Sequence, residues 1–450
     1  MKFELTKSFI EDIQSALEEN NIVFIKAQIF ELHPADIADI VKHLGLDEGK
    51  HLFDYLDEEQ AAQTLVELDE DIREKLLELF SPKEIAEQVD QLDSDDAADL
   101  LGELSEQRKD EVISKMEDKE HASEVIDLLR YDEDSAGGLM QSEFVQVRSS
   151  FTVKRCIIEL RKQAEEVEKV YSIYVVDESD VLLGVLSLKR LLFAKPTSLI
   201  SELYQSNNIK YVKTNSHKED VADIMKRYDL IAIPVVDYQN KLVGRITIDD
   251  VVDVMQEEAE KDYQLASGIT DNVEATASVF KNTKSRLPWI LIGLLGGVLS
   301  SLILQNYEAD IQINPVLAFF IPLITATGGN VGVQSSAIVV QGLASKEFMF
   351  KGIFKRILKE LLVGVLIGLI CGILIFLFNF FTNTDIIMGI TIGISIFIVV
   401  IIAAIFGTLF PLILNKLKID PALATGPFVT TTNDILGLSV YFMIAFMLYN

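Results

Sequence analysis

The hydrophobic positions along the chain change their pattern near residue 280. Before that point, small apolar groups alternate with charged residues, which is typical of a soluble protein. After it, five nearly continuous apolar stretches are each long enough to cross a bilayer. They lie at residues 287–304, 315–340, 361–381, 386–414 and 426–449. The pattern therefore predicts a soluble half followed by a membrane half with five spanning helices.

A twelve-residue repeat runs through the first part of the soluble half. Apolar residues recur at this interval from Leu32 to Met116, and the next position is often a helix-capping residue such as Asp57. Ser81-Pro82-Lys83-Glu84 has the form of a capping box with proline at the first helical position. The repeat predicts short helices of roughly eight to ten residues that stack into a small superhelix. Such arrays usually bind or scaffold, so we expect no chemistry in residues 1–131.

A second repeat follows, with an offset of 60 residues. Ile173–Gly184 matches Ile233–Gly244, and each copy has the pattern of a strand, an acidic turn, a strand and then a helix. A further helix is expected before each copy, at Val153–Gln163 and at Glu219–Tyr228. This arrangement resembles a tandem pair of CBS domains over residues 132–255. Such pairs commonly sense adenosyl nucleotides, so the resemblance makes ATP a candidate ligand.

Charge is distributed very unevenly between the two halves. The formal net charge is −29, yet residues 1–280 carry 30 basic and 62 acidic side chains while the remainder carries ten basic and seven acidic. So acidic a surface disfavours nucleic acid and anionic lipid as partners and suits cations, although a merely solvated surface would look the same. The two cysteines allow neither a disulfide framework nor a zinc site of their own.

Basic residues in the loops predict the orientation in the membrane. Lysines and arginines precede the first span and lie between the second and third and between the fourth and fifth, whereas the other two loops contain none. The positive-inside rule therefore places the N-terminus inside and the C-terminus outside. The first 25 residues hold no apolar run of signal-peptide type, so the acidic half is expected in the cytoplasm, beside the cell membrane.

Two of the predicted spans are irregular. The second contains Pro322 and then the run Thr327–Gln334, rich in glycine and amides, and the fifth is entered through Gly426-Pro427. Such residues occur where a broken helix lines a cavity, and also where small residues let two helices pack closely. Together with Asn330, the carboxylate of Asp434 favours a polar pathway through the membrane.

Asp434 is the residue that fits least well in an apolar helix. A charge near the centre of a span costs about 2.5–3.5 kcal/mol on insertion scales. No lysine or arginine lies within the five predicted spans to compensate it. The carboxylate is therefore protonated, exposed to a wet cavity or paired with an imported cation. A wetted helix end near the cytoplasmic face is the plainest alternative.

The order of these parts, together with four short motifs, makes the chain similar to a known family. The motifs are Ser135–Met140, Gly328–Ser335, Asp420–Leu423 and Thr431–Asp434. The chain resembles the MgtE family of magnesium channels and transporters over nearly its whole length. The resemblance implies a multidomain, mainly α protein. Its parts are an acidic helical domain (1–131), a CBS pair (132–255), a connecting helix (256–283) and a five-helix transmembrane domain (284–450).

The resemblance also implies where the ion passes. Members of the family are homodimers whose pore lies between the two membrane domains, so Asp434 of each subunit would hold a hydrated Mg²⁺. Mg²⁺ keeps most of its waters and is held through one or two carboxylates, which suits a single aspartate per subunit. We expect a backbone bend at Thr327–Gly329 whose carbonyls, with the Asn330 side chain, accept hydrogen bonds from those waters. The implied pore-lining residues are Thr327, Gly328, Gly329, Asn330, Gly426, Pro427 and Asp434.

The family senses cytosolic Mg²⁺ through acidic residues between its parts. Mg²⁺ would draw the mutually repelling acidic faces together and close the pore, so we expect inhibition by high internal Mg²⁺. The matching positions are Asp95, Asp99, Glu219, Asp229, Asp250, Asp253, Glu258, Asp262 and Asp420. The chain departs from the family at His217 and Lys261, where relatives have acidic residues, and at Gly426, where some have asparagine.

Three functions remain in competition at this point. The leading one is a Mg²⁺-selective channel or transporter, and the second is a broader divalent path that also carries Mn²⁺, Co²⁺ or Ni²⁺. The third is a membrane-anchored nucleotide sensor without transport, against which Asp434 argues, since an anchor needs no intramembrane carboxylate. An enzyme is not expected, because the sequence shows no nucleophile–base pair, P-loop or cluster of metal-ligating histidines.

Overall fold

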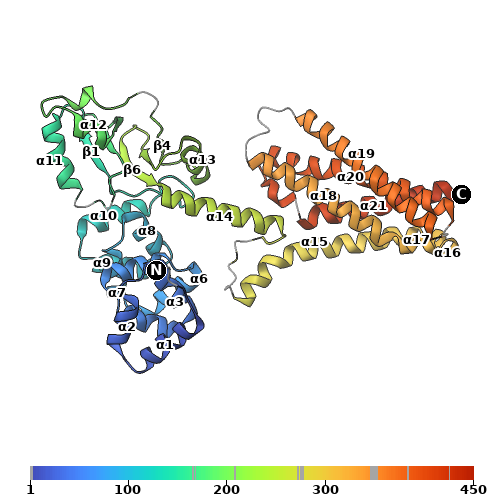
Figure 1. Ribbon diagram of the computed structural model, residues 1–450, viewed down its shortest axis with the longest axis horizontal. Helices are drawn as coiled ribbons and strands as arrows, with labels where there is room; N and C mark the ends of the chain where they lie inside the picture. Colours follow the sequence, from blue (N-terminus) through green and yellow to red (C-terminus); the bar gives the residue numbers. More distant parts are fainter. Residues whose placement is uncertain are drawn as a thin grey trace. The chain divides into compact units, whose positions relative to one another are not determined.

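The computed structural model describes residues 4–164, 167, 169–206, 209–270, 273, 278–344, 353–382, 385–424 and 426–449. The chain divides into two compact units, Met1–Glu257 and Glu258–Asn450 (Figure 1). Helix α14 (Ile248–Ala266) contributes residues to both. The described residues are mainly helical, as the sequence predicts, and strands occur only in the middle of the first unit.

Ten short helices open the first unit. They are α1 (Lys7–Glu18), α2 (Ile22–Ile29), α3 (Pro34–His43), α4 (Leu46–Phe53), α5 (Glu58–Val66), α6 (Glu70–Leu79), α7 (Pro82–Val89), α8 (Ser94–Gly102), α9 (Glu106–Lys115) and α10 (Lys119–Leu128). From α2 to α9 each helix begins twelve residues after the one before it, which confirms the predicted repeat. The Ser81 capping box is present, whereas the Asp93 side chain makes no capping hydrogen bond.

The doubled αβ module forms two small sheets of the same topology. The first contains β1 (Val145–Arg148), β2 (Ile173–Val176) and β3 (Leu182–Leu186), and the second β4 (Val212–Lys213), β5 (Ala232–Val236) and β6 (Leu242–Thr247). In both, the first pair is parallel and the second antiparallel. The helices between them are α11 (Val153–Gln163), α12 (Leu188–Phe193) and α13 (Lys218–Tyr228), with a single 3₁₀ turn at Ile200–Glu202. The tandem CBS pair is thereby confirmed.

One hydrophobic core joins the helical array to the second sheet. It extends from Ile10 in α1 to Val254 in α14, whereas the first sheet has a separate core around Val175. The array is thus anchored to the second αβ copy, and acidic residues of α8 and α14 are brought to the same region.

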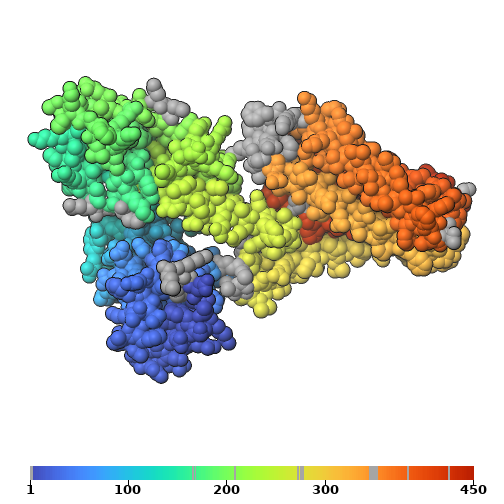
Figure 2. All heavy atoms as spheres, viewed as in Figure 1, coloured from blue at the N-terminus to red at the C-terminus, as the bar shows by residue number. Residues whose placement is uncertain are grey.

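The second unit holds the membrane half. Its elements are α15 (Val279–Asn306), α16 (Glu308–Ile313), α17 (Val316–Phe319), α18 (Ile321–Ala344), α19 (Ile353–Phe381), α20 (Ile386–Lys416), a 3₁₀ turn at Pro421–Ala424 and α21 (Gly426–Tyr449). Five helices are long and apolar enough to span a membrane, as predicted. In the space-filling view their atoms, yellow to red, lie against one another along the unit (Figure 2). Helix α20 is the most buried of the five and packs against α18, α19 and α21.

Three details differ from the sequence-based expectations. Helix α18 is continuous through Thr327–Gly329, so the predicted bend there is wrong, and the break lies before it at Phe320. Helix α19 begins at Ile353, eight residues before the predicted third span, so basic side chains do lie within it. A single connecting helix over 256–283 is also wrong, because α14 ends at Ala266 and Gly268 turns the chain with a φ of +80°.

Candidate functional site

Asp434 lies two turns into α21, against a glycine of α18. The side chain is half-buried, and its Oδ1 atom is 4.0 Å from the point where Gly329 would carry a Cβ. Within the described part of the chain, no hydrogen bond or ion pair reaches this carboxylate. The absence of a side chain at Gly329 leaves room beside a carboxylate that none of the described residues neutralises.

The neighbouring residue fixes how α21 meets α18. Asn433 is 2% exposed, and its Nδ2 donates to the Gly328 carbonyl at 3.4 Å. About two turns further on, the Tyr441 hydroxyl donates to the Leu317 carbonyl at 2.9 Å. These two buried bonds set the rotation of α21, and therefore the position of Asp434.

The other predicted pore residues fall into two groups. Gly328 and Gly329 are both buried, with Gly328 facing Val399 of α20 and Gly329 facing Thr430 of α21, whereas Asn330 is exposed. Thr327 donates its hydroxyl back to the Leu323 carbonyl at 2.7 Å, as threonines in helices often do. The structure therefore brings Gly328, Gly329 and Asp434 together and leaves Asn330 on an open face of the unit.

The start of α21 carries a close contact with the end of α14. A Cβ at Gly426 would lie 2.7 Å from the Ala266 carbonyl oxygen, and one at Gly268 would lie 2.8 Å from Cγ of Pro427. Only glycine at both positions permits this approach. Gly426, a departure from the family pattern, thus lets the end of α14 rest on the helix that holds Asp434.

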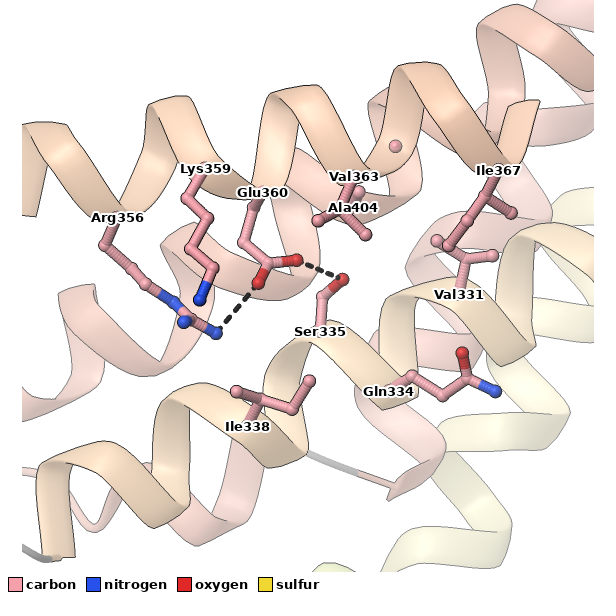
Figure 3. A pocket seen from close by; sticks show the side chains of 11 residues that line it. Val331, Gln334, Ser335, Ile338, Arg356, Lys359, Glu360, Val363, Ile367 and Ala404 are labelled. Atoms are coloured by element: carbon pink, nitrogen blue, oxygen red, sulfur yellow. Dashed lines mark hydrogen bonds and ion pairs between the residues drawn. The ribbon is translucent and has the colours of Figure 1, made fainter. Parts of the chain in front are cut away.

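A second intramembrane carboxylate was missed by the sequence reasoning. Glu360 on α19 is 4% exposed and is held between two partners (Figure 3). Its Oε1 pairs with Nη2 of Arg356 at 2.8 Å, and its Oε2 accepts from the Ser335 hydroxyl at 3.2 Å. The group lines a cavity of about 190 Å³ between α18, α19 and α20. Unlike Asp434, Glu360 has a counter-charge among the described residues, the Arg356 guanidinium.

Removing that carboxylate should destabilise the membrane unit. In Glu360→Ala the partly buried Arg356 guanidinium loses this ion pair and the Ser335 hydroxyl loses its acceptor, which together cost about 1–3 kcal/mol. We expect a clear fall in the thermal unfolding midpoint of the purified protein in detergent. Glu308→Gln, at an exposed position in α16, is the control and should leave the midpoint unchanged. An equal midpoint for Glu360→Ala and the wild type would show that the pair contributes nothing.

The soluble unit contains a dense carboxylate cluster built by α8 and α14. It comprises Asp95, Asp96, Asp99 and Asp250. Burial raises the pKa of Asp95 well above its usual range, and the nearby Asp250 carboxylate adds to the effect. The same two causes raise the pKa of Asp96 to about 7. Burial raises the pKa of Asp250 to about 6, against hydrogen bonds from Thr247 that lower it.

Asp99 and Asp253 lie at the edge of this cluster. Burial raises the pKa of Asp99, and the Arg73 guanidinium opposes it. Asp99 remains exposed to solvent, which weakens the effect of burial. Burial and the charges of Glu67 and Asp249 raise the pKa of Asp253, which is also exposed. Close carboxylates whose pKa values are raised favour an added proton or cation.

One member of the cluster is tied to the segment that enters the CBS pair. Asp95 accepts from Gln141 Nε2 at 3.2 Å, and Gln141 Oε1 accepts from Arg245 Nε at 2.7 Å. Asp95 thus has a hydrogen-bond donor, and the chain of bonds links α8 to strand β6. Asp96 was missed in the sequence because helical spacing pointed to Asp95 and Asp99 only.

The remaining predicted sensor residues are dispersed. Glu219 and Asp229 are exposed at the two ends of α13, where Asp229 ends the helix with a φ of 50°. His217 caps the start of the same helix, its Nδ1 accepting from the Glu219 backbone N–H at 3.4 Å. His217 therefore has a structural role at the start of α13.

Three of the predicted sensor residues belong to the second unit. Glu258 is paired with Lys261 at 3.2 Å, and Asp262 lies exposed on the same helix. Asp420 accepts from the Ala422 backbone N–H at 2.8 Å and so caps the 3₁₀ turn before α21. Lys261 therefore competes with any cation for Glu258.

The fold defines a membrane protein with five candidate spanning helices and a large acidic first unit. Residues 321–444 match the family model MgtE, described as a divalent cation transporter, residues 32–134 match the MgtE intracellular N domain, and residues 136–196 and 200–257 match the CBS domain. The chain belongs to the MgtE family, and its N-terminal domain is intracellular.

Relatives named Magnesium transporter MgtE agree with this assignment. The chain is 35% identical to the protein of Bacillus subtilis (strain 168), over 71% of this chain and 70% of the relative. It is 33% identical to the protein of Enterococcus faecalis (strain ATCC 700802 / V583), over 72% and 71%. A solved cytosolic domain of the Mg²⁺ channel MgtE in complex with ATP is 34% identical, with a TM-score of 0.51, and covers 54% of this chain and 99% of that one.

Proposed function

We propose that this chain carries Mg²⁺ across the cytoplasmic membrane as a homodimer, with Asp434 as the ion site. The observation that carries the proposal is the half-buried Asp434 carboxylate, which lies beside Gly329 with no counter-charge from the described residues. An intramembrane carboxylate is costly unless it serves an ion pathway. Relatives named as magnesium transporters supply the identity of the ion.

A two-fold axis would place two such carboxylates around one ion. Two close carboxylates repel each other and need a cation or proton between them. Mg²⁺ is reluctant to lose its waters and is usually held by one or two carboxylates with several waters retained. The exposed Asn330 amide on the neighbouring helix is then available to those waters. The C-terminus would lie outside, at the end of the unit that also carries α16 and α17 (Figure 1).

We further propose that cytosolic Mg²⁺ closes the pore through α14. This helix is continuous from Ile248 to Ala266, so it carries Asp250 of the acidic cluster at one end and reaches the Gly426 contact at the other. Mg²⁺ binding to the cluster would hold α14 in place, and its far end would press on the start of α21. ATP at the CBS pair is proposed as a modulator, on the basis of the relative's ATP complex.

Ion flux into proteoliposomes tests the transport proposal directly. The purified protein should admit Mg²⁺, and millimolar Mg²⁺ on the cytosolic side should suppress that flux. Competition by Mn²⁺, Co²⁺ or Ni²⁺ at similar concentrations would instead favour the broader divalent pathway. A protein that binds nucleotide but passes no ion would be the membrane-anchored sensor.

Substituting Gly426 should loosen this gating without stopping transport. The added methyl of Gly426→Ala would overlap the Ala266 carbonyl and push α14 away from α21. Overpacking costs about 1–3 kcal/mol, which corresponds to a rise of about fivefold or more in the Mg²⁺ concentration that inhibits flux. Gly293→Ala is the control, because the described residues leave open space around its Cβ. Equal inhibition curves for both variants would refute a role for the Gly426 contact.

A further inference from the structure

Three metal-ligating side chains meet where the helical array joins the CBS pair. His121 and Glu124 lie one turn apart on α10, and Glu143 lies two residues before β1. One ligand atom from each residue lies within 4.8 Å of the other two. All three side chains are partly buried, and none belongs to the Asp95 cluster. Sequence reasoning missed this group because a single histidine carries little signal by itself.

The histidine is oriented by a contact outside the cluster. His121 Nε2 lies 3.2 Å from the Val89 carbonyl oxygen. A carbonyl can only accept, so Nε2 carries the proton, and in the neutral ring the lone pair is on Nδ1. That nitrogen lies 4.0 Å from Oε1 of Glu143, and the two side chains are only 13% and 12% exposed. Imidazoles that bind metals characteristically donate their other N–H to a carbonyl or carboxylate in this way.

The carboxylates are also held in place. Glu143 accepts from the Ser94 backbone N–H at 3.1 Å and from the Ser94 hydroxyl at 2.8 Å, so the first turn of α8 fixes its orientation. A lone pair and two carboxylates thus converge in a partly buried space, which is an arrangement that a cation stabilises.

We propose that His121, Glu124 and Glu143 bind a divalent transition-metal ion, with Zn²⁺ as the best match to the ligand set. Imidazole nitrogen with carboxylate oxygen suits Zn²⁺ and its first-row neighbours, whereas Mg²⁺ prefers oxygen ligands alone. Bonds of about 2.0–2.2 Å place tetrahedral ligand atoms roughly 3.3 Å apart, so side-chain rotations that close about 1 Å complete the site.

A metal ion bound at this site would affect the region beside the Asp95 cluster. The bound ion would link α10 to the segment entering β1, and Ser94, which holds Glu143, directly precedes Asp95 of the acidic cluster. A transition metal would therefore stabilise the joint beside the proposed Mg²⁺ sensor while using none of its carboxylates. This inference does not depend on whether the membrane half carries Mg²⁺.

Cobalt binding to the untagged, metal-stripped full-length protein tests the proposal. With Mg²⁺ present in large excess, Co²⁺ should produce visible d–d absorption that saturates at one ion per chain and that Zn²⁺ abolishes. His121→Ala should weaken Co²⁺ binding at least tenfold, and His43→Gln, an exposed histidine on α3, should not. Glu124→Gln, which keeps the side-chain shape, should also weaken it and decides the matter if His121→Ala fails to fold.

Three results would overturn the assignment. If His121→Ala and Glu124→Gln bound Co²⁺ like the wild type, the ion would lie elsewhere. If Mg²⁺ displaced Co²⁺ at comparable concentrations, the site would be an oxygen-ligand site of the Mg²⁺ type. A cluster that merely shares a proton would show no Co²⁺ absorption that depends on these residues, and the proposal would fail.

Discussion

Asp434→Ala is expected to abolish growth rescue of a bacterium that lacks Mg²⁺ uptake. Asp434 is proposed to provide the fixed charge that holds the ion within the membrane, and no other described side chain pairs with it. Truncating one member of a close charge pair costs about 2–5 kcal/mol. That loss corresponds to at least about 30-fold in ion occupancy. Growth at limiting Mg²⁺, with membrane expression checked for each variant, is the measurement.

The isosteric variant separates charge from packing. Asp434→Asn keeps the shape of the side chain beside Gly329, so it should fold and dimerise normally and still fail to rescue growth. Asp310→Asn, in α16 at the other end of the unit, is the matched control and should rescue fully. Rescue by Asp434→Ala equal to that of the wild type would remove this carboxylate from the mechanism.

The parts of the fold that were predicted correctly are those encoded locally. The starts of the short helices follow a twelve-residue repeat because capping residues and apolar spacing act within a few positions. The five spans were recognised because continuous apolar stretches need no tertiary information. Both sheets were located because the strand pattern that is repeated 60 residues apart is also a local feature of the sequence.

The start of α19 shows where hydropathy misleads. Arg356 and Glu360 looked like loop residues, since an isolated charge is costly in a span. Placed one turn apart they neutralise each other, and Ser335 from α18 completes the group. Ser335 is 25 residues away from Glu360 in sequence, so only the packing of α18 on α19 could reveal this hydrogen bond.

The sequence alone did not decide what the glycines of the second span do. Cavity lining and close packing were both compatible with the run Thr327–Gln334. The structure shows close packing for Gly332, because a side chain there would overlap Asn433 of α21. Small residues that let two backbones approach explain why α18 remains a continuous helix. Gly329 combines this role with the space beside Asp434.

The acidic cluster shows the same limit in the soluble half. Helical spacing linked Asp95 to Asp99, and the family resemblance added Asp250. Neither indicated Asp96, whose pKa is raised by burial and also by the charge of Asp250 on α14. The electrostatic coupling across two helices far apart in sequence depends on the shared core between the array and the second CBS copy.

Mg²⁺ should stabilise the soluble half much more at pH 8 than at pH 5. Asp96 and Asp250 have pKa values of about 7 and about 6 in the folded state, against an ordinary 3.8. A carboxyl whose folded pKa is raised contributes stability that is fully present below the unfolded value and lost as pH rises through the folded value. Without Mg²⁺, the packed arrangement should therefore weaken between about pH 4 and pH 7, because the unfolded chain releases these protons near pH 4 whereas the folded cluster holds them up to about pH 6 to 7.

Mg²⁺ can bind these carboxylates only at a pH at which they have lost their protons. The stabilisation that Mg²⁺ gives should therefore depend on pH. At pH 5 the cluster keeps its protons, and millimolar Mg²⁺ should change the thermal unfolding midpoint little. At pH 8 it should raise the midpoint by at least about 2–4 °C, the shift that 1 kcal/mol produces in a domain of this size. The two midpoint shifts are measured by thermal unfolding of the detergent-purified protein. Unfolding is followed by circular dichroism at each pH, with and without Mg²⁺.

A variant that removes the charges separates this mechanism from general screening by salt. Combined Asp95→Asn, Asp96→Asn and Asp250→Asn should give a midpoint that depends much less on pH and on Mg²⁺ than that of the wild type, together with Mg²⁺ flux that high cytosolic Mg²⁺ no longer suppresses. Asp110→Asn, on the exposed face of α9, should behave like the wild type. A Mg²⁺ effect that is equal at pH 5 and pH 8, or that persists in the triple variant, would show that the ion acts elsewhere. Because the neutral amides remove repulsion without binding Mg²⁺, loss of inhibition in a stable protein would assign gating to the bound ion itself.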